Sequence, residues 1–167
     1  TVPFNKIKLE HYEPAIMEGI KQHTAEVEAI INNPEAPTFE NTIVALEYAG
    51  ELLDRVVTVF FTLNSAETSD EMQELAQKLS PILTEHSNNI SLDERLFARV
   101  KAAYEATEMS TLTTEQQRLL QKSYDSFARN GANLSDEDKA KYRELTTELS
   151  KTTLAFGQNM LKATNAY

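Results

Sequence analysis

Apolar residues recur at intervals of three and four along almost the whole chain, and no segment alternates apolar and polar residues over more than a few positions. An interval of three to four is typical of amphipathic helices, whereas strict alternation is typical of half-buried strands. Only four Gly and five Pro interrupt the 167 residues, so long helices are possible. The pattern predicts an all-α fold, an antiparallel helical bundle or array of about six helices, several of them long.

Capping residues and helix breakers place the helix boundaries. Thr38 is a candidate N-cap, Thr113 to Gln116 has the sequence of a capping box, and Ser135 precedes an acidic first turn. Gly131 lies where helices commonly end. The predicted helices cover residues 11–31, 38–64, 69–89, 93–106, 113–130 and from 135 onward.

The helix predicted for residues 38–64 is the most apolar of the six. It carries two apolar stripes, Leu46, Ala49, Leu53, Val56, Phe60 and Leu63 on one, and Ile43, Gly50, Val57 and Phe61 on the other. Two stripes indicate burial on two sides. At 1.5 Å per residue such a helix is roughly 40 Å long, so we expect a continuous helix that serves as the central spine. The last predicted helix carries a further stripe at Tyr142, Leu145, Leu149 and Phe156.

Composition limits the classes of partner. Sixteen Lys and Arg against 26 Asp and Glu give a net charge of −10, which repels phosphate backbones and anionic lipid surfaces. We therefore expect neither a nucleic-acid nor a membrane partner. No run approaches the roughly 18 apolar residues of a membrane span, so the chain is expected to be soluble. The absence of Cys excludes disulfides and thiolate chemistry but leaves the compartment, cytoplasm or periplasm, open.

The three histidines, His11, His23 and His86, are the first candidates for chemistry. None begins the His-Glu-x-x-His pattern that would place two imidazoles on one zinc ion. His23 and His86 lie on apolar stripes, so they could meet in the core as a metal pair or a pH switch. We favour partly buried imidazoles, each with one nitrogen bonded to a neighbour, because no third ligand is apparent. His11 is expected to be a cap or packing residue.

The remaining polar clusters have simpler explanations. The threonines lie at caps or on helix faces, without the glycines of a nucleophile elbow. The acidic groups at 67–74 and 136–138 lie at helix starts, where negative charge is favoured. The loop at 129–133 could contact a ligand, although a turn between helices accounts for its Gly and Asn. No residue of the chain is therefore expected to be catalytic, cofactor-binding or metal-binding.

Two segments, PTFENT at 37–42 and FARNGANL at 127–134, resemble the N-terminal region of the thimet oligopeptidase / oligopeptidase A / peptidyl-dipeptidase family of zinc metallopeptidases. Weaker matches extend the likeness over nearly the whole chain, among them HYEPA at 11–15, VFFTL at 59–63 and FGQN at 156–159. Within the family, the chain looks closer to the bacterial peptidyl-dipeptidase branch.

The resemblance implies a role without catalytic residues. In such enzymes the N-terminal helices form one wall of a deep channel, while the zinc ligands and the catalytic Glu lie in a later domain, which this chain lacks. We therefore expect residues 1–167 to be a single N-terminal domain, not catalytic alone. Its partners would be its own C-terminal catalytic domain, which holds the zinc, and short peptide substrates. The alternative is a free-standing helical protein-interaction module. Both interpretations predict an apolar face that the domain cannot bury alone.

Overall fold

The computed structural model describes residues 2–166 and contains no strand in that range, which confirms the all-α prediction. Six helices have 13 or more residues: α1 (Tyr12–Ile31), α3 (Glu51–Ala66), α4 (Asp70–Ser91), α5 (Glu94–Ala106), α6 (Thr114–Arg129) and α7 (Asp136–Asn165). Shorter elements are the 3-10 turns η1 (Leu9–His11) and η3 (Met109–Thr111), the π-helical segment η2 (Phe39–Val44) and the single turn α2 (Ala45–Tyr48).

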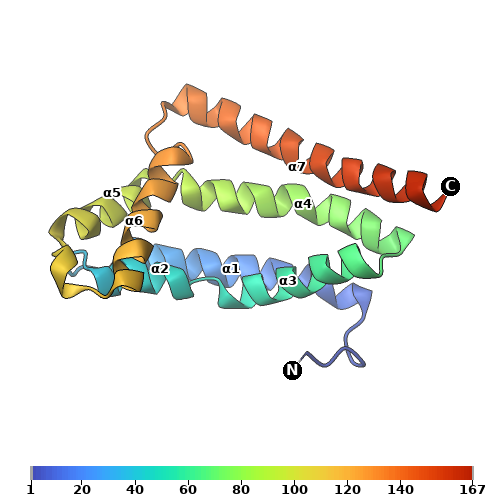
Figure 1. The fold of residues 1–167 in the computed structure, drawn as a ribbon, viewed down its shortest axis with the longest axis horizontal. Coiled ribbons are helices and arrows are strands. Elements are labelled where there is room, and N and C mark those ends of the chain that lie inside the picture. Colours follow the sequence, from blue (N-terminus) through green and yellow to red (C-terminus); the bar gives the residue numbers. More distant parts are fainter. Residues whose placement is uncertain (1, 167) are drawn as a thin grey trace.

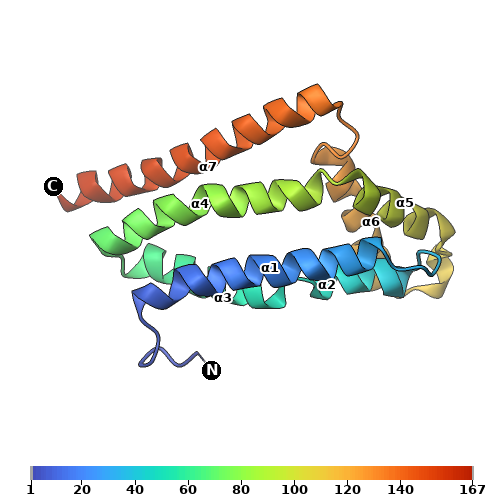
Figure 2. The ribbon, with the colours of Figure 1, turned by 180° about the vertical axis from the view of Figure 1, so that it is seen from behind.

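The long helices run back and forth along one axis (Figure 1). Helix α1 and the α2–α3 segment lie side by side in both the front and the rear view, α4 lies over them, and α7 lies over α4 (Figures 1 and 2). Helices α5 and α6 close one end of this stack. The antiparallel array expected from the short connections is therefore present.

The expected caps are formed. Thr38 Oγ1 accepts from the backbone N–H of Asn41 at 3.0 Å, and Asn41 Oδ1 accepts from the backbone N–H of Thr38 at 2.8 Å. Thr113 and Gln116 make the same reciprocal pair. Ser135 Oγ accepts from the N–H of Asp138. These bonds satisfy donors that a helix start would otherwise leave without partners.

The prediction of one continuous helix over residues 38–64 is wrong. The helix stops after Tyr48, where Ala49 is extended (φ −66°, ψ 138°) and Gly50 is left-handed (φ 81°, ψ 14°). The backbone N–H of Gly50 donates to the carboxylate of Glu26 on α1, at 2.7 Å, rather than to a carbonyl of its own helix. The Gly50 N–H therefore bonds to a carboxylate on another helix instead of a carbonyl of its own helix. A glycine permits the left-handed backbone that results.

The core consists of two clusters along the stack. One lies where α5 and α6 close the end and includes Val27, Ile43, Val100 and Leu120. The other lies among α1, α3 and α4 and includes Tyr12, Ile16, Leu53, Phe60 and Leu79. Leu53 and Phe60 are thus buried, as the apolar stripes predict.

Helix α7 packs on the body mainly through polar side chains, with Leu154 as an apolar contact. Arg143 Nη1 donates to Glu85 Oε1 at 2.9 Å, and Gln77 Nε2 donates to Gln158 Oε1 at 2.7 Å. Thr146 Oγ1 accepts from the side-chain amide of Asn88 at 2.9 Å. The face of α7 that meets the body is therefore mainly hydrophilic.

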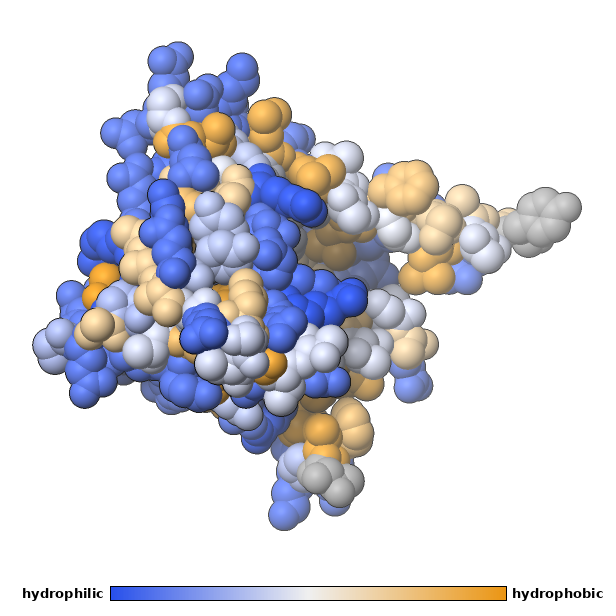
Figure 3. All heavy atoms as spheres, turned by 60° about the vertical axis from the view of Figure 1, so that its left-hand side comes forward, coloured by the Kyte–Doolittle hydropathy of each residue, from blue (hydrophilic) through white to orange (hydrophobic). Residues whose placement is uncertain are grey.

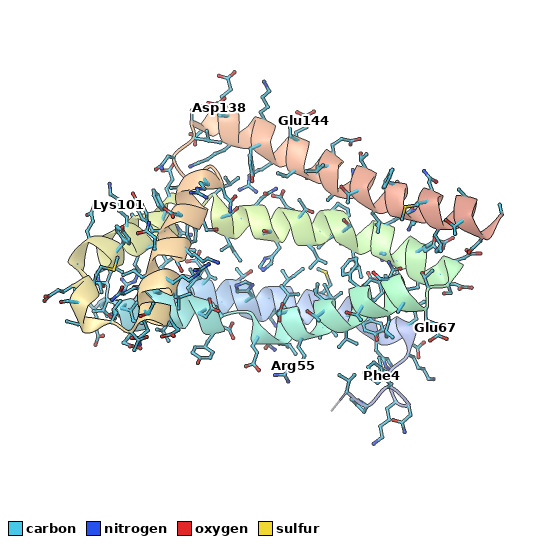
Figure 4. All side chains as sticks on the ribbon, in the orientation of Figure 1. Phe4, Arg55, Glu67, Lys101, Asp138 and Glu144 are labelled. Carbon is cyan, nitrogen blue, oxygen red and sulfur yellow. The ribbon has the colours of Figure 1, made fainter. Side chains whose placement is uncertain are left out.

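The apolar stripe of α7 lies on its outer side. Leu145, Leu149, Phe156 and Met160 are 60%, 65%, 68% and 60% exposed. Figure 3 shows orange, apolar side chains at the surface of the end that projects from the body, and Figure 4 shows that Glu144 points away from α4. Of the four residues in the stripe read from the sequence, only Tyr142 is partly buried, and the other three are exposed. This outer side of α7 is an apolar face that the domain leaves unburied, as we expected from the sequence.

Candidate functional site

His23 of α1 and His86 of α4 meet between the two core clusters. His86 Nε2 and His23 Nδ1 lie 3.1 Å apart, and the two rings are nearly perpendicular, at 70°. His86 is only 8% exposed and His23 is half-buried. Each imidazole therefore has the other imidazole as its bonded neighbour. From the sequence we considered a meeting of the two histidines in the core but did not favour it.

A cavity of about 570 Å³ adjoins the pair. Leu53, Val57, Leu83, Ile90 and Phe127 are among its apolar lining residues, and Asp54, Ser87, Ser91, Ser126 and Asn130 are among its polar ones. It is bordered by α1, α3, α4 and α6, so four helices that are distant in sequence contribute to it.

Gly50 lies directly against the ring of His23. A Cβ atom at Gly50 would lie 2.7 Å from Nδ1 and 2.8 Å from Cγ of that ring, closer than real Cβ atoms approach. One turn further along α1, Glu26 accepts the hydrogen bond from the Gly50 N–H. Helix α1 therefore holds the break between α2 and α3 at two points. We call these three contacts, His23 with His86, His23 with Gly50 and Glu26 with Gly50, the histidine joint.

Burial governs the protonation of the pair. Desolvation lowers the pKa of His23 below the ordinary value of 6.5, and the charge of Glu26 opposes this shift. Desolvation also lowers the pKa of His86, and the charge that His23 would carry lowers it further. Near neutral pH both rings are therefore uncharged, and one donates its N–H to the other.

Within residues 2–166, neither a hydrogen-bonded serine nor a metal-binding cluster accompanies the two imidazoles. Three serines line the cavity, yet within residues 2–166 no hydrogen bond joins a serine hydroxyl to either imidazole. A nucleophile needs such a bond to a base. Nor does any group of three or more His, Cys, Asp or Glu side chains lie in position to hold a metal ion within the described range.

The other sequence candidates lie apart from this site. His11 Nδ1 accepts from the N–H of Lys8 at the start of the 3-10 turn η1, as a cap residue does. The loop at 129–133 ends α6, with Gly131 left-handed at φ 92° and the Ala132 N–H donating to the Phe127 carbonyl. This is the Schellman pattern of a helix end, so the turn interpretation agrees with the structure.

Arg99 of α5 holds the segment that precedes η2. Its Nη1 donates to the carbonyl of Asn33 at 2.9 Å, and its Nη2 donates to the carbonyl of Glu35 at 3.1 Å. Asn41 adds a hydrogen bond from its side-chain amide to the Ala36 carbonyl at 2.9 Å. The conspicuous PTFENT segment is thus fixed by a buried cation that the sequence analysis did not single out. The sequence signal that could have identified Arg99 is its place as a single Arg on the otherwise apolar face of α5.

Hydropathy excludes a membrane-spanning helix from the described part of the chain. Within residues 2–166, every helix is either too short or too polar to span a bilayer. The apolar face of α7 is therefore a stripe on an amphipathic helix and not a membrane-crossing segment.

Comparison with known proteins identifies the family. The family model for the neurolysin/thimet oligopeptidase N-terminal domain matches residues 14–139. The chain is 44% identical over 160 residues to the dipeptidyl carboxypeptidase of Escherichia coli, which covers 96% of this chain and 24% of that protein. It is 30% identical over 162 residues to oligopeptidase A of Haemophilus influenzae, which covers 97% of this chain and 24% of that protein.

A more distant similarity reaches plants. The chain is 23% identical over 168 residues to an organellar oligopeptidase A of Arabidopsis thaliana, with 99% of this chain and 21% of that protein covered. The chain thus spans about a quarter of the length of the relatives it matches. It belongs to the neurolysin/thimet oligopeptidase family, whose N-terminal domain it represents.

Proposed function

We propose that this chain is the non-catalytic N-terminal domain of a zinc metallopeptidase that hydrolyses short peptides, and that it forms one wall of the channel through which these peptides reach the catalytic residues. The relatives' names support a peptidase, either a dipeptidyl carboxypeptidase or an oligopeptidase. The zinc and its ligands would belong to polypeptide outside the 167 residues. There the metal would polarise the scissile carbonyl and activate water.

The outer face of α7 is the observation that carries this proposal. Leu145, Leu149, Phe156 and Met160 recur at intervals of four, seven and four, which places them on one side of the helix. The opposite side already contacts α4 through hydrogen bonds and an ion pair. Apolar residues outward and polar residues inward is the reverse of an ordinary surface helix. A partner that covers the outer face restores the usual arrangement.

The partner that we assign is the remainder of the parent polypeptide. This chain matches only 24% of the length of its relatives, so about three-quarters of each relative lies outside the matched region. Complete burial of one Leu or Phe side chain contributes about 1.5–3 kcal/mol, so four such residues make a stable contact between domains. Substrate access would then be limited by the position in which this contact holds the array.

The test compares the same substitution in two contexts. In the isolated chain, Leu149→Ser with Phe156→Ser should change the free energy of unfolding little, because both side chains are exposed. In the full-length parent the same pair should lower thermal stability and promote cleavage between the two domains by protease. Glu144→Ser with Lys151→Ser, exposed polar positions on the same helix, is the matched control and should leave the parent unchanged.

The alternative is a free-standing helical protein-interaction module, and the same apolar face favours it. The encoding gene and the substitution test distinguish the two functions. A reading frame that continues into a His-Glu-x-x-His motif supports the peptidase. A frame that ends after residue 167, or a parent whose stability is indifferent to the serine pair, would leave the interaction module as the better interpretation.

A further inference from the structure

The histidine joint lies between the two core clusters. Along α1, His23 separates Ile16 of one core cluster from Val27 of the other. Along α4, His86 lies between Leu79 and Ile90, which belong to or pack against different clusters. The helix break at Gly50 and the cavity lie at the same level. At this level the two clusters are therefore separated by the contact between the two histidines and by the cavity.

The pair tolerates one added proton but not two. In the neutral pair one ring donates an N–H across the 3.1 Å contact and the other accepts it. A first proton on the outer nitrogen of the donating ring leaves that hydrogen bond intact. A second proton must go to the accepting nitrogen, which places two N–H groups against each other. It also places two positive charges on rings whose centres are 5.0 Å apart.

We propose that the His23–His86 pair is a pH-sensitive latch, in which uptake of the second proton separates the rings and releases the break between α2 and α3. Separation of the rings moves His23, whose ring lies against Gly50. Glu26, one turn away on α1, then holds the break alone, and its hydrogen bond from the Gly50 N–H breaks as α3 moves away. The expected motion is a local opening of α3 relative to α1 and η2, with the cluster around α5 and α6 still packed. This proposal does not depend on peptide hydrolysis.

The surroundings of the pair determine whether the latch opens at low pH or at high pH. Glu26 of α1 and Asp54 of α3 are the acidic groups near the pair or its cavity, and the cavity lining that the structure describes includes no Lys or Arg. Burial outweighs the charge of Glu26 and keeps both pKa values low in the closed state. In the open state, hydrated rings return toward 6.5 and bind more protons. The latch is therefore fully closed above about pH 6.5 and opens as the pH falls below it.

Hydrogen exchange of backbone amides measures the opening directly. Exchange is followed by NMR at pH 7.5 and at pH 5.0, with intrinsic exchange rates divided out. The reporters are the amide of Gly50, which donates to Glu26, and that of Asp54, which donates to the Gly50 carbonyl. We expect at least a tenfold loss of protection at these amides, because each pH unit below the open-state pKa favours protonation tenfold. Val100 and Leu120, buried in the other cluster, should lose less than twofold.

A variant without the two imidazoles is the control for other titrating groups. His23→Gln combined with His86→Gln keeps polar, uncharged side chains at both positions, and its pH-dependent loss at Gly50 should fall below about twofold. His11→Gln, a histidine outside the cavity, should retain the full wild-type loss. The latch proposal is overturned if the double variant loses as much protection at Gly50 as the wild type does. It is also overturned if all amides of the wild-type chain lose protection equally.

A second measurement needs no variant. The ring Cε1–H resonances of the wild-type chain are titrated between pH 8 and pH 4.5. Coupled rings should titrate in two separated steps below the ordinary range, with the Gly50 amide resonance following the second step. Two independent titrations near the ordinary histidine value, or a Gly50 resonance that does not respond, overturn the proposal.

Discussion

Gly50→Ala adds a single methyl group where neither the backbone nor the neighbouring His23 ring accommodates it. At φ 81° an Ala residue occupies the left-handed region, which costs about 1–2 kcal/mol. The added Cβ would also lie 2.7–2.9 Å from three atoms of the His23 ring, so the ring has to move. Its displacement breaks the 3.1 Å contact with His86 and leaves a buried polar group without a partner, at a further cost of about 1–3 kcal/mol. The sum is a destabilisation of about 2–5 kcal/mol.

Urea denaturation followed by circular dichroism measures this loss, and Gly157→Ala is its matched control. Gly157 lies within α7, where a Cβ would meet no atom within 4 Å, so Ala should be neutral or stabilise by about 0.5–1 kcal/mol. The same change, Gly to Ala, should therefore lower the free energy of unfolding at position 50 but not at position 157.

A double-mutant cycle separates the two parts of the cost. In a His23→Ala background the ring is absent, so Gly50→Ala should retain only the backbone part, about 1–2 kcal/mol. A Gly50→Ala protein within 0.5 kcal/mol of wild type, or an equal cost with and without the ring, would refute the account of the histidine joint.

Three further outcomes follow from the structure. Phe60→Ala removes a fully buried ring from the α1–α3–α4 cluster and should cost about 3–5 kcal/mol in urea denaturation; a loss below about 0.5 kcal/mol would mean that this cluster is not the core. Arg99→Lys removes the planar donors that bond the carbonyls of Asn33 and Glu35, and should cost about 1.5–3 kcal/mol, whereas Arg118→Lys, on α6, should cost less than about 0.5 kcal/mol. The isolated chain should retain no stoichiometric zinc after dialysis, and chelation should leave its melting temperature unchanged; a one-to-one zinc content that His86→Gln abolishes would contradict this.

Local rules predicted most of the helices because each rule depends on neighbouring residues. The caps at Thr38, Thr113 and Ser135 involve donors three positions away, so their sequence signals are complete within one turn. The apolar stripe that includes Phe60 reports burial correctly for the same reason.

The break at Gly50 could not be predicted by these rules because its cause is tertiary. The acceptor of the Gly50 N–H is Glu26, 24 residues earlier in the chain. The left-handed backbone is stabilised only when α1 brings that carboxylate and the His23 ring to the same place. A single Gly in an apolar stripe is compatible with both a continuous helix and a break.

The orientation of α7 is a similar case. Its stripe predicts an apolar face correctly, but periodicity does not indicate which face meets α4. The hydrogen bonds of Arg143 and Gln158 decide the orientation, and their partners lie on another helix. The meeting of His23 and His86, 63 residues apart, likewise depends on how α1 and α4 pack.

The peptide-length profile of the full-length parent enzyme tests the central proposal most directly. The parent is assayed on peptides of graded length, as wild type and with substitutions on those surface residues of this domain that face the channel, and zinc content and folding are checked in each case. If the domain is a channel wall, these substitutions should change the relative kcat/KM for short and long peptides while zinc content stays at the wild-type level. An unchanged length profile in properly folded, zinc-loaded variants would contradict the channel-wall role.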